Sequence, residues 1–185
     1  MDWLVWAGVA FVALYVLWTY NGLVTLRVRA NKAFADIDVQ LKQRHDLIPN
    51  LIEAVKGYMG HERETLQAVV ETRNAALKAQ GSTDQAASEG ALSGALGRLL
   101  ALSEAYPDLK ASTNFQQLQT DLADIEDKLA AARRFFNNAV GEYNAGTQRF
   151  PAVLFASLAG FDQKPFFEVG EAQRKSLETP PKVAF

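Results

Sequence analysis

Residues 3–26, WLVWAGVAFVALYVLWTYNGLVTL, form an apolar stretch without a charged side chain at the start of this 185-residue chain. A helix rises about 1.5 Å per residue, so the stretch would span roughly 36 Å, enough to cross a hydrocarbon core of about 30 Å. We therefore expect a single transmembrane anchor over residues 1–26. Its amphipathic aromatic rings, which favour the headgroup level, cluster towards the two ends; they are Trp3, Trp6, Trp18 and Tyr20.

The charges that flank the apolar stretch predict its orientation. The first charges after it are basic, Arg27, Arg29 and Lys32, whereas only Asp2 and the terminal amine precede it. Lys and Arg beside a span favour the cytoplasmic side of the membrane. We therefore expect the N-terminus outside and the rest of the chain in the cytoplasm.

A cleaved signal peptide is the alternative interpretation of the apolar stretch. A signal peptide has a basic n-region and an apolar run of about 7–15 residues, and this sequence has neither. The nearest A-x-A pattern, residues 33–35, lies farther along, inside a helical apolar pattern. Because the chain contains no cysteine, a lipidated cysteine, a disulfide framework and a thiolate metal site are excluded.

The rest of the chain, residues 27–185, is long enough for one domain with its own core. The whole sequence has a formal net charge of −2 at pH 7. A nucleic-acid-binding surface needs clustered basic residues, which this balanced charge disfavours. We therefore expect one globular domain and no nucleic-acid partner.

Four later segments have apolar residues at steps of three and four, the spacing of one helix face. Residues 34–59 predict a helix that could run unbroken from the span, bent at Pro49, which lacks a backbone donor. Residues 61–77 and 92–102 predict two more helices. Residues 115–143 predict the last and clearest one, with an approximate heptad pattern typical of coiled coils.

Two other segments differ from these helices. Residues 80–90 are rich in Gly, Ser, Thr and Gln and predict a loop. Residues 150–167 are aromatic, and we expect them to pack against the end of the bundle, because an isolated apolar segment is a liability in water. The expected fold class is all-α, a transmembrane helix leading into an antiparallel four-helix bundle with long helices over residues 27–170. A flexible C-terminal tail, residues 171–185, is expected to follow.

Several motifs resemble the LemA family. Residues 41–51 read LKQRHDLIPNL, a pattern quite specific to that family, and the likeness extends in order from residue 20 to about residue 170. One departure is DIED at residues 124–127, where family members usually read Thr-Glu-Asn. Further matching motifs are YNGLV at 20–24, VKGY at 55–58, YPDLK at 106–110, FQQLQ at 115–119 and FP at 150–151.

The resemblance implies an N-terminal anchor and an α-helical bundle. We therefore expect a single-pass protein of the bacterial inner membrane. The resemblance implies no reaction, since the family has no established general biochemical activity. One branch of the family, in magnetotactic bacteria, is associated with building magnetosome membranes.

The sequence carries no motif of a known catalytic or metal site. His45 and His61 form no His-x-x-x-His or Glu-x-x-His pair, so we expect both at helix surfaces or ends. Gly90, Gly94 and Gly97 lack the Lys-Ser/Thr pair that completes a phosphate-binding loop, and no Gly-x-Ser-x-Gly turn occurs. We expect a non-enzyme with no catalytic residue, no metal ligand and no cofactor.

Five charged residues lie beside the apolar faces or at the start of the predicted helices, and we name them the polar seam. They either pair between helices and fix the register of the bundle, or form a charged patch that binds a partner. We expect the first, with pairs between neighbouring helices in one layer. The polar seam consists of Arg44, Glu62, Arg73, Glu126 and Arg133.

Two hypotheses of function remain open. The first is a membrane-tethered scaffold or adaptor that binds unidentified proteins or assembles with copies of itself. Anchoring confines neighbouring copies, and small residues in the span allow close helix approach, so we expect a homo-oligomer. The second is a ligand-binding receptor or unrecognised enzyme that uses a cleft between helices near Asp46, Glu62 or Glu126. A wet interior cavity with unpaired polar groups would favour the second.

Overall fold

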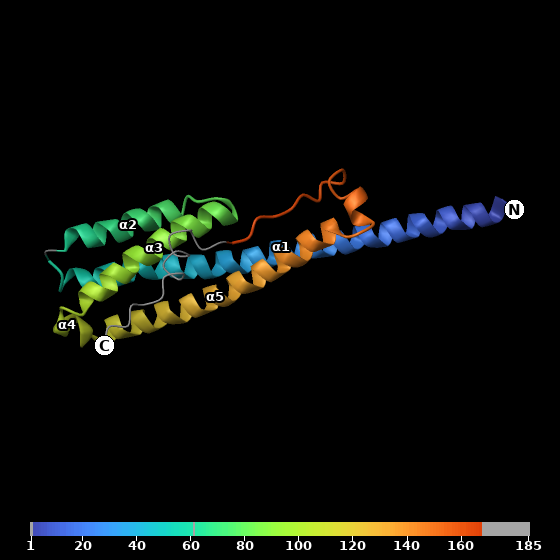
Figure 1. The fold of residues 1–185 in the computed structure, drawn as a ribbon. Helices are drawn as coiled ribbons and strands as arrows, with labels where there is room; N and C mark the ends of the chain where they lie inside the picture. Colours follow the sequence, from blue (N-terminus) through green and yellow to red (C-terminus); the bar gives the residue numbers. More distant parts are fainter. Residues whose placement is uncertain (1, 61, 168–185) are drawn as a thin grey trace, which may run out of the picture. The chain divides into compact units, whose positions relative to one another are not determined.

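The computed structural model describes residues 2–60 and 62–167, of which 82% are helical and none lies in a strand. The all-α fold class is therefore confirmed. The predicted tail, residues 171–185, lies outside the described residues. In chain order the elements are α1 (Asp2–Lys56), α2 (Arg63–Ala76), α3 (Gly81–Ser103), α4 (Pro107–Lys110), α5 (Thr113–Gln148) and the 3-10 turn η1 (Ala152–Leu154) (Figure 1).

Helix α1 is a single helix of 55 residues that continues through Pro49. The predicted continuity between the apolar stretch and the next helix is therefore confirmed. Among the described residues, α1 is the one helix long and apolar enough to cross a membrane by length and composition. Its apolar part is uncovered, since Trp3, Phe11 and Trp18 are all exposed. An apolar surface of this extent in water needs a covering, which the described residues do not supply.

The chain divides into two compact units, and both α1 and α5 contribute to each. Among the described residues, the first unit contains residues 2–37 and 131–166, and the second contains residues 38–60, 62–130 and 167. Each unit has its own buried apolar cluster.

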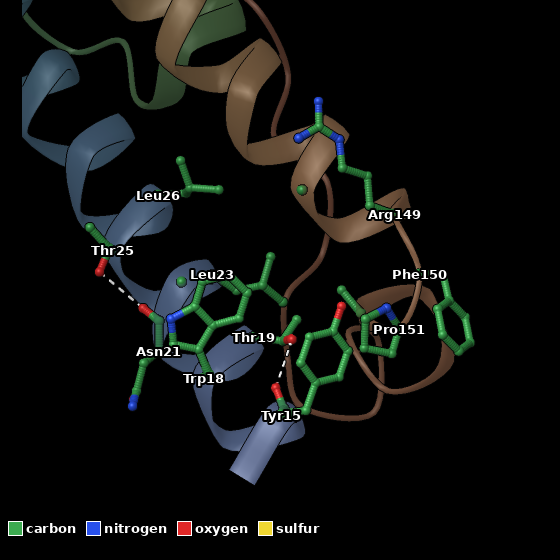
Figure 2. Close-up of a pocket in the computed structure, with 13 residues that line it drawn as sticks. Tyr15, Trp18, Thr19, Asn21, Leu23, Thr25, Leu26, Arg149, Phe150 and Pro151 are labelled. Atoms are coloured by element: carbon green, nitrogen blue, oxygen red, sulfur yellow. Dashed lines mark hydrogen bonds between the residues drawn. The ribbon is translucent and has the colours of Figure 1, made fainter. Parts of the chain in front are cut away.

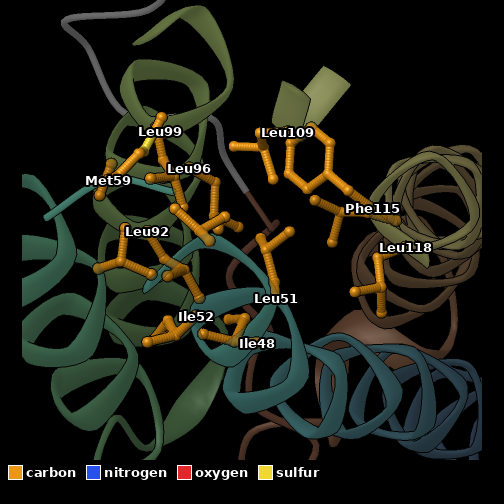
Figure 3. Packing of buried hydrophobic residues seen from close by; sticks show 14 of the residues in the cluster. Ile48, Leu51, Ile52, Met59, Leu92, Leu96, Leu99, Leu109, Phe115 and Leu118 are labelled. Carbon is orange, nitrogen blue, oxygen red and sulfur yellow. The ribbon is translucent and has the colours of Figure 1, made fainter. Parts of the chain in front are cut away.

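The core of the second unit collects side chains from all five helices (Figure 3). Helix α4, of four residues, begins at Pro107, where the fixed φ of proline suits the first helical position, and it buries Leu109. Helix α2 packs along α3 and buries Val69. The central members of this core are Ile48, Leu51 and Ile52 of α1, Leu92, Leu96 and Leu99 of α3, and Phe115 and Leu118 of α5.

The predicted loop over residues 80–90 is wrong, because α3 begins at Gly81 and includes them. Gly81 has φ of +77°, a conformation that favours glycine, and the helix starts directly from it. Three residues of the early turns, Ser82, Ala86 and Glu89, are buried. Tertiary packing therefore makes helical a segment whose composition alone favours a loop.

The core of the first unit joins α1, α5 and the segment after α5. Leu23 of α1, Tyr143 of α5 and three later residues, Ala152, Ala156 and Phe161, form one buried cluster. The aromatic segment, which we expected to pack against the end of a bundle, packs within this unit against α1 and α5. Farther along the helices the rings of Phe34 and Phe136 lie 5.4 Å apart.

Gly146 marks the closest approach of α5 to α1 in the first unit. A Cβ atom at this position would lie 2.9 Å from Leu26 Cδ1 and 3.3 Å from Leu23 Cδ2. The first distance is too short for a real side chain, so only glycine allows the two helices to pack this closely without a shift of Leu26.

Candidate functional site

A buried group of charged and polar side chains lies inside the second unit, and we name it the ionic cluster. Arg44 of α1 is at its centre, with only 1% of its side chain exposed. Arg44 Nη1 lies 3.1 Å from Glu89 Oε2, and Nη2 lies 2.8 Å from Glu126 Oε1. Nη2 also donates a hydrogen bond to Ser93 Oγ at 2.8 Å. The ionic cluster consists of Arg44, His45, Glu89, Ser93 and Glu126.

Glu89 uses both carboxylate oxygens within the ionic cluster and is 1% exposed. Oε2 pairs with Arg44, and Oε1 lies 2.7 Å from Nε2 of the buried His45. A buried charge is tolerated only when it is paired and hydrogen-bonded, and Glu89 meets that condition on both oxygens. Glu126, at 38% exposed, closes the cluster on the solvent side.

Within the polar seam, the structure brings Arg44 and Glu126 together, whereas sequence reasoning missed Glu89, His45 and Ser93. The expectation that His45 lies at a helix surface or end is wrong, because its side chain is buried against Glu89. Glu89 was missed because it falls in the segment predicted to be a loop. The available signal was the four-residue spacing of Glu89 and Ser93, which places both on one helix face.

Arg73 has a different role from the one expected, because it donates to a backbone carbonyl. Pro49 has no N–H, so the carbonyl four residues earlier, that of His45, loses its helical donor. Arg73 Nε donates to that carbonyl oxygen at 2.9 Å. A side chain of α2 therefore satisfies the acceptor that a proline in α1 leaves open, and the two helices are joined at this point.

The last two residues of the polar seam lie elsewhere. Glu62, just before α2, accepts a hydrogen bond from the Tyr106 hydroxyl at 3.3 Å. Burial, together with the Glu62 carboxylate, raises the pKa of Tyr106. Arg133 is partly buried, has an interaction partner and belongs to the first unit. Within the second unit, Arg44 and Glu126 thus contact each other, whereas Glu62 and Arg73 contact other groups.

The residues expected to flank the membrane are found in the first unit. Trp3, Trp6 and Trp18 are exposed. Tyr20 makes an edge-on contact with Phe161, with ring centroids 5.2 Å apart. Two of the three basic residues that follow the apolar stretch have partners: Arg27 lies 4.1 Å from the centroid of the Phe161 ring, and Arg29 pairs with Glu142 at 2.7 Å.

A pocket of about 480 Å³ opens beside the end of the apolar stretch in the first unit. Figure 2 shows Tyr15 and Trp18 of α1 lining the pocket together with Arg149, Phe150 and Pro151 from the end of α5 and the following turn. Its lining combines aromatic rings with hydroxyl and amide groups and one guanidinium, so it is amphipathic.

A smaller hollow of about 310 Å³ lies in the second unit next to the ionic cluster. Its polar lining includes Asp38, His45, Asp46 and Gln85. A hydrogen bond from Lys42 lowers the pKa of Asp46. Within residues 2–60 and 62–167, no three His, Cys, Asp or Glu side chains are grouped to hold a metal ion.

The fold defines the class of protein: an all-helical chain with a long apolar N-terminal helix. The LemA family matches residues 33–185, and the chain belongs to that family. Magnetosome protein MamQ of Magnetospirillum gryphiswaldense is 24% identical, over 93% of this chain and 72% of that relative. Magnetosome protein MamQ 2 of Paramagnetospirillum magneticum gives the same three values. Protein LemA of Metamycoplasma hominis is 24% identical over 86% of this chain and 73% of that relative.

Proposed function

We propose that this LemA-family protein is a membrane-tethered scaffold or adaptor, which acts through protein–protein contacts or self-assembly at the membrane. One observation carries the proposal: among the described residues the apolar stretch of α1 is uncovered, yet it is continuous with a helix whose far end lies in a packed core. The similarity to magnetosome proteins supports a role at a membrane.

The proposal includes an architecture and an orientation. Residues 1–26 span the inner membrane once, with the N-terminus outside. Residues 27–170 form a cytoplasmic, antiparallel four-helix bundle, which is supported by the short connections between α1, α2 and α3. The basic residues Arg27 and Arg29 support the cytoplasmic placement. A reporter fused to Phe185 tests it: a fluorescent-protein fusion should be active, and an active alkaline-phosphatase fusion would contradict the orientation.

We further propose that the protein is not an enzyme and that the ionic cluster is structural. The pairing of Glu89 with both Arg44 and His45 supports this, because groups committed to one another are not presented to a substrate. The competing proposal, a ligand-binding receptor, is favoured by the hollow beside His45, where the buried Gln85 Oε1 has no hydrogen-bond partner among the described residues.

Site-specific photocrosslinking in intact cells tests the scaffold proposal. The photoreactive residue is placed at Leu77 at the end of α2, which is exposed, and at Leu99, which is buried, as a matched control. We expect discrete adducts, either with a second copy or with another protein, from position 77 and none from position 99. Two results together would contradict the proposal. The variant with the photoreactive residue at position 77 would give no adduct, and the detergent-purified chain would show a strictly monomeric mass distribution across a wide concentration range.

A further inference from the structure

The segment that follows α5 in the first unit has two different faces. Pro151, Ala152 and Ala156 are buried. The opposite face is apolar and open to solvent: Phe150 is 77% exposed and Leu158 is 92% exposed. Val153 and Leu154 are exposed on the same segment. Several exposed apolar side chains on a short segment that is held in place by a packed underside are typical of an interaction site.

The packed underside fixes the position of this segment along α1. Phe161 contacts Tyr20 through its ring edge and lies beneath the Arg27 guanidinium, and both groups belong to α1. Arg27 Nη1 also donates to the backbone carbonyl of Gly160 at 3.3 Å. Leu23 lies in the same buried cluster as Ala152 and Ala156. The segment is therefore held at the level of residues 20–27, where the uncharged stretch ends and the first basic residue follows.

We propose that residues 150–158 form a second membrane contact, an interfacial turn that lies in the same leaflet as the end of the span. This rests on the proposed membrane anchoring of α1. In the interfacial turn, Phe150, Leu154 and Leu158 enter the boundary between headgroups and acyl chains, the depth at which apolar faces of interfacial segments are buried. A lipid surface is the occupant because the exposed side chains lie level with the end of a stretch that lipid itself surrounds.

Charge and shape beside the turn fit the same occupant. Arg149 directly precedes Phe150 and is exposed, and Arg27 lies on the adjacent part of α1, whereas the charge of Arg29 is paired with Glu142. Basic residues at this level attract anionic headgroups. The amphipathic pocket of about 480 Å³ lies between the turn and Trp18, so acyl chains and headgroups of boundary lipids can fill it (Figure 2).

Depth measurement by fluorescence quenching tests the interfacial turn in the full chain. Because the protein contains no cysteine, single-cysteine variants can be labelled without a background. Leu158→Cys probes the turn, Val12→Cys probes the span, and Asn138→Cys probes an exposed polar position on α5. Each variant is labelled with a small fluorophore and reconstituted at low density into vesicles containing anionic phospholipid. A nitroxide is attached to some acyl chains, near the headgroup end in one set of vesicles to match position 158 and near the methyl end in a second set to match position 12.

We expect the nitroxide lipid to quench the label at position 158, as at position 12, and to leave the label at position 138 bright. Since Leu158 is almost fully exposed, its replacement leaves the core intact. Quenching at position 12 without quenching at position 158 would overturn the interfacial turn and leave the anchor standing. A label at position 158 that reports an apolar environment but escapes lipid quenching would also overturn it, because protein would then be the covering. Absence of quenching at position 12 would refute the anchor itself.

Discussion

The hydrogen bond between Arg73 and the His45 carbonyl should contribute most to the free energy of unfolding while Pro49 is present. Arg73→Met keeps the length of the side chain but removes its donor, and leaves the carbonyl without the partner that it has at 2.9 Å. A hydrogen bond from a charged group contributes about 1.5–3 kcal/mol. For a chain of this size, a loss of about 2 kcal/mol lowers the melting temperature by roughly 4–8 °C.

Replacement of Pro49 should remove this dependence. Pro49→Ala restores a backbone N–H that can donate to the His45 carbonyl, and Pro49 is exposed, so no cavity is formed. We expect Arg73→Met to cost clearly less in the Pro49→Ala background than in the natural chain. The coupling free energy between the two substitutions should be about 1–2 kcal/mol, within the range measured for groups that share a hydrogen bond.

The assay is unfolding of the four full-length proteins in mild detergent, followed by far-UV circular dichroism. Arg98→Met, at an exposed position of α3, is the matched control and should change the free energy of unfolding by less than about 0.5 kcal/mol. Equal costs of Arg73→Met in both backgrounds would refute the reasoning, since Arg73 would then act through a group other than the carbonyl that proline leaves open.

Three further predictions follow from buried contacts. Glu89→Ala should cost about 3–5 kcal/mol because it leaves a buried arginine underpaired, whereas the partly exposed Glu126→Ala should cost much less; equal losses of thermal stability would contradict this ranking. Overpacking against Leu26 should offset the roughly 1 kcal/mol that alanine gains over glycine inside a helix, so Gly146→Ala should stabilise the chain more in a Leu26→Ala background than in the natural chain. Burial raises the pKa of Tyr143, so its neutral hydroxyl adds stability that is complete below about pH 10 and declines as pH rises through the folded-state pKa. Tyr143→Phe should therefore weaken the alkaline loss of stability in a pH series of unfolding measurements, at a cost of about 1 kcal/mol at neutral pH.

The spacing of apolar residues was sufficient to predict the long helices. A helix that buries one face carries apolar residues at the helical period, so the sequence pattern reveals both the helix and its buried face. Phe115 and Leu129 of α5, for example, are both buried as the heptad pattern requires. The pattern failed at residues 80–90, where helix formation depends on contacts with another segment and not on local preference. Glu89 belongs to that segment, and so the ionic cluster could be predicted only in part, from Arg44 and Glu126.

The dependence of early α3 on its surroundings has a consequence for local motion. Residues 81–90 combine weak helix formers with a carboxylate that must be paired where it is buried, so this half-helix is stable only while Glu89 contacts Arg44 and His45. Opening of the contact exposes both the charge and the backbone of the segment at once. Amide hydrogens of residues 85–90 should then exchange together, as one cooperative unit, and before those of the leucine-rich half of α3.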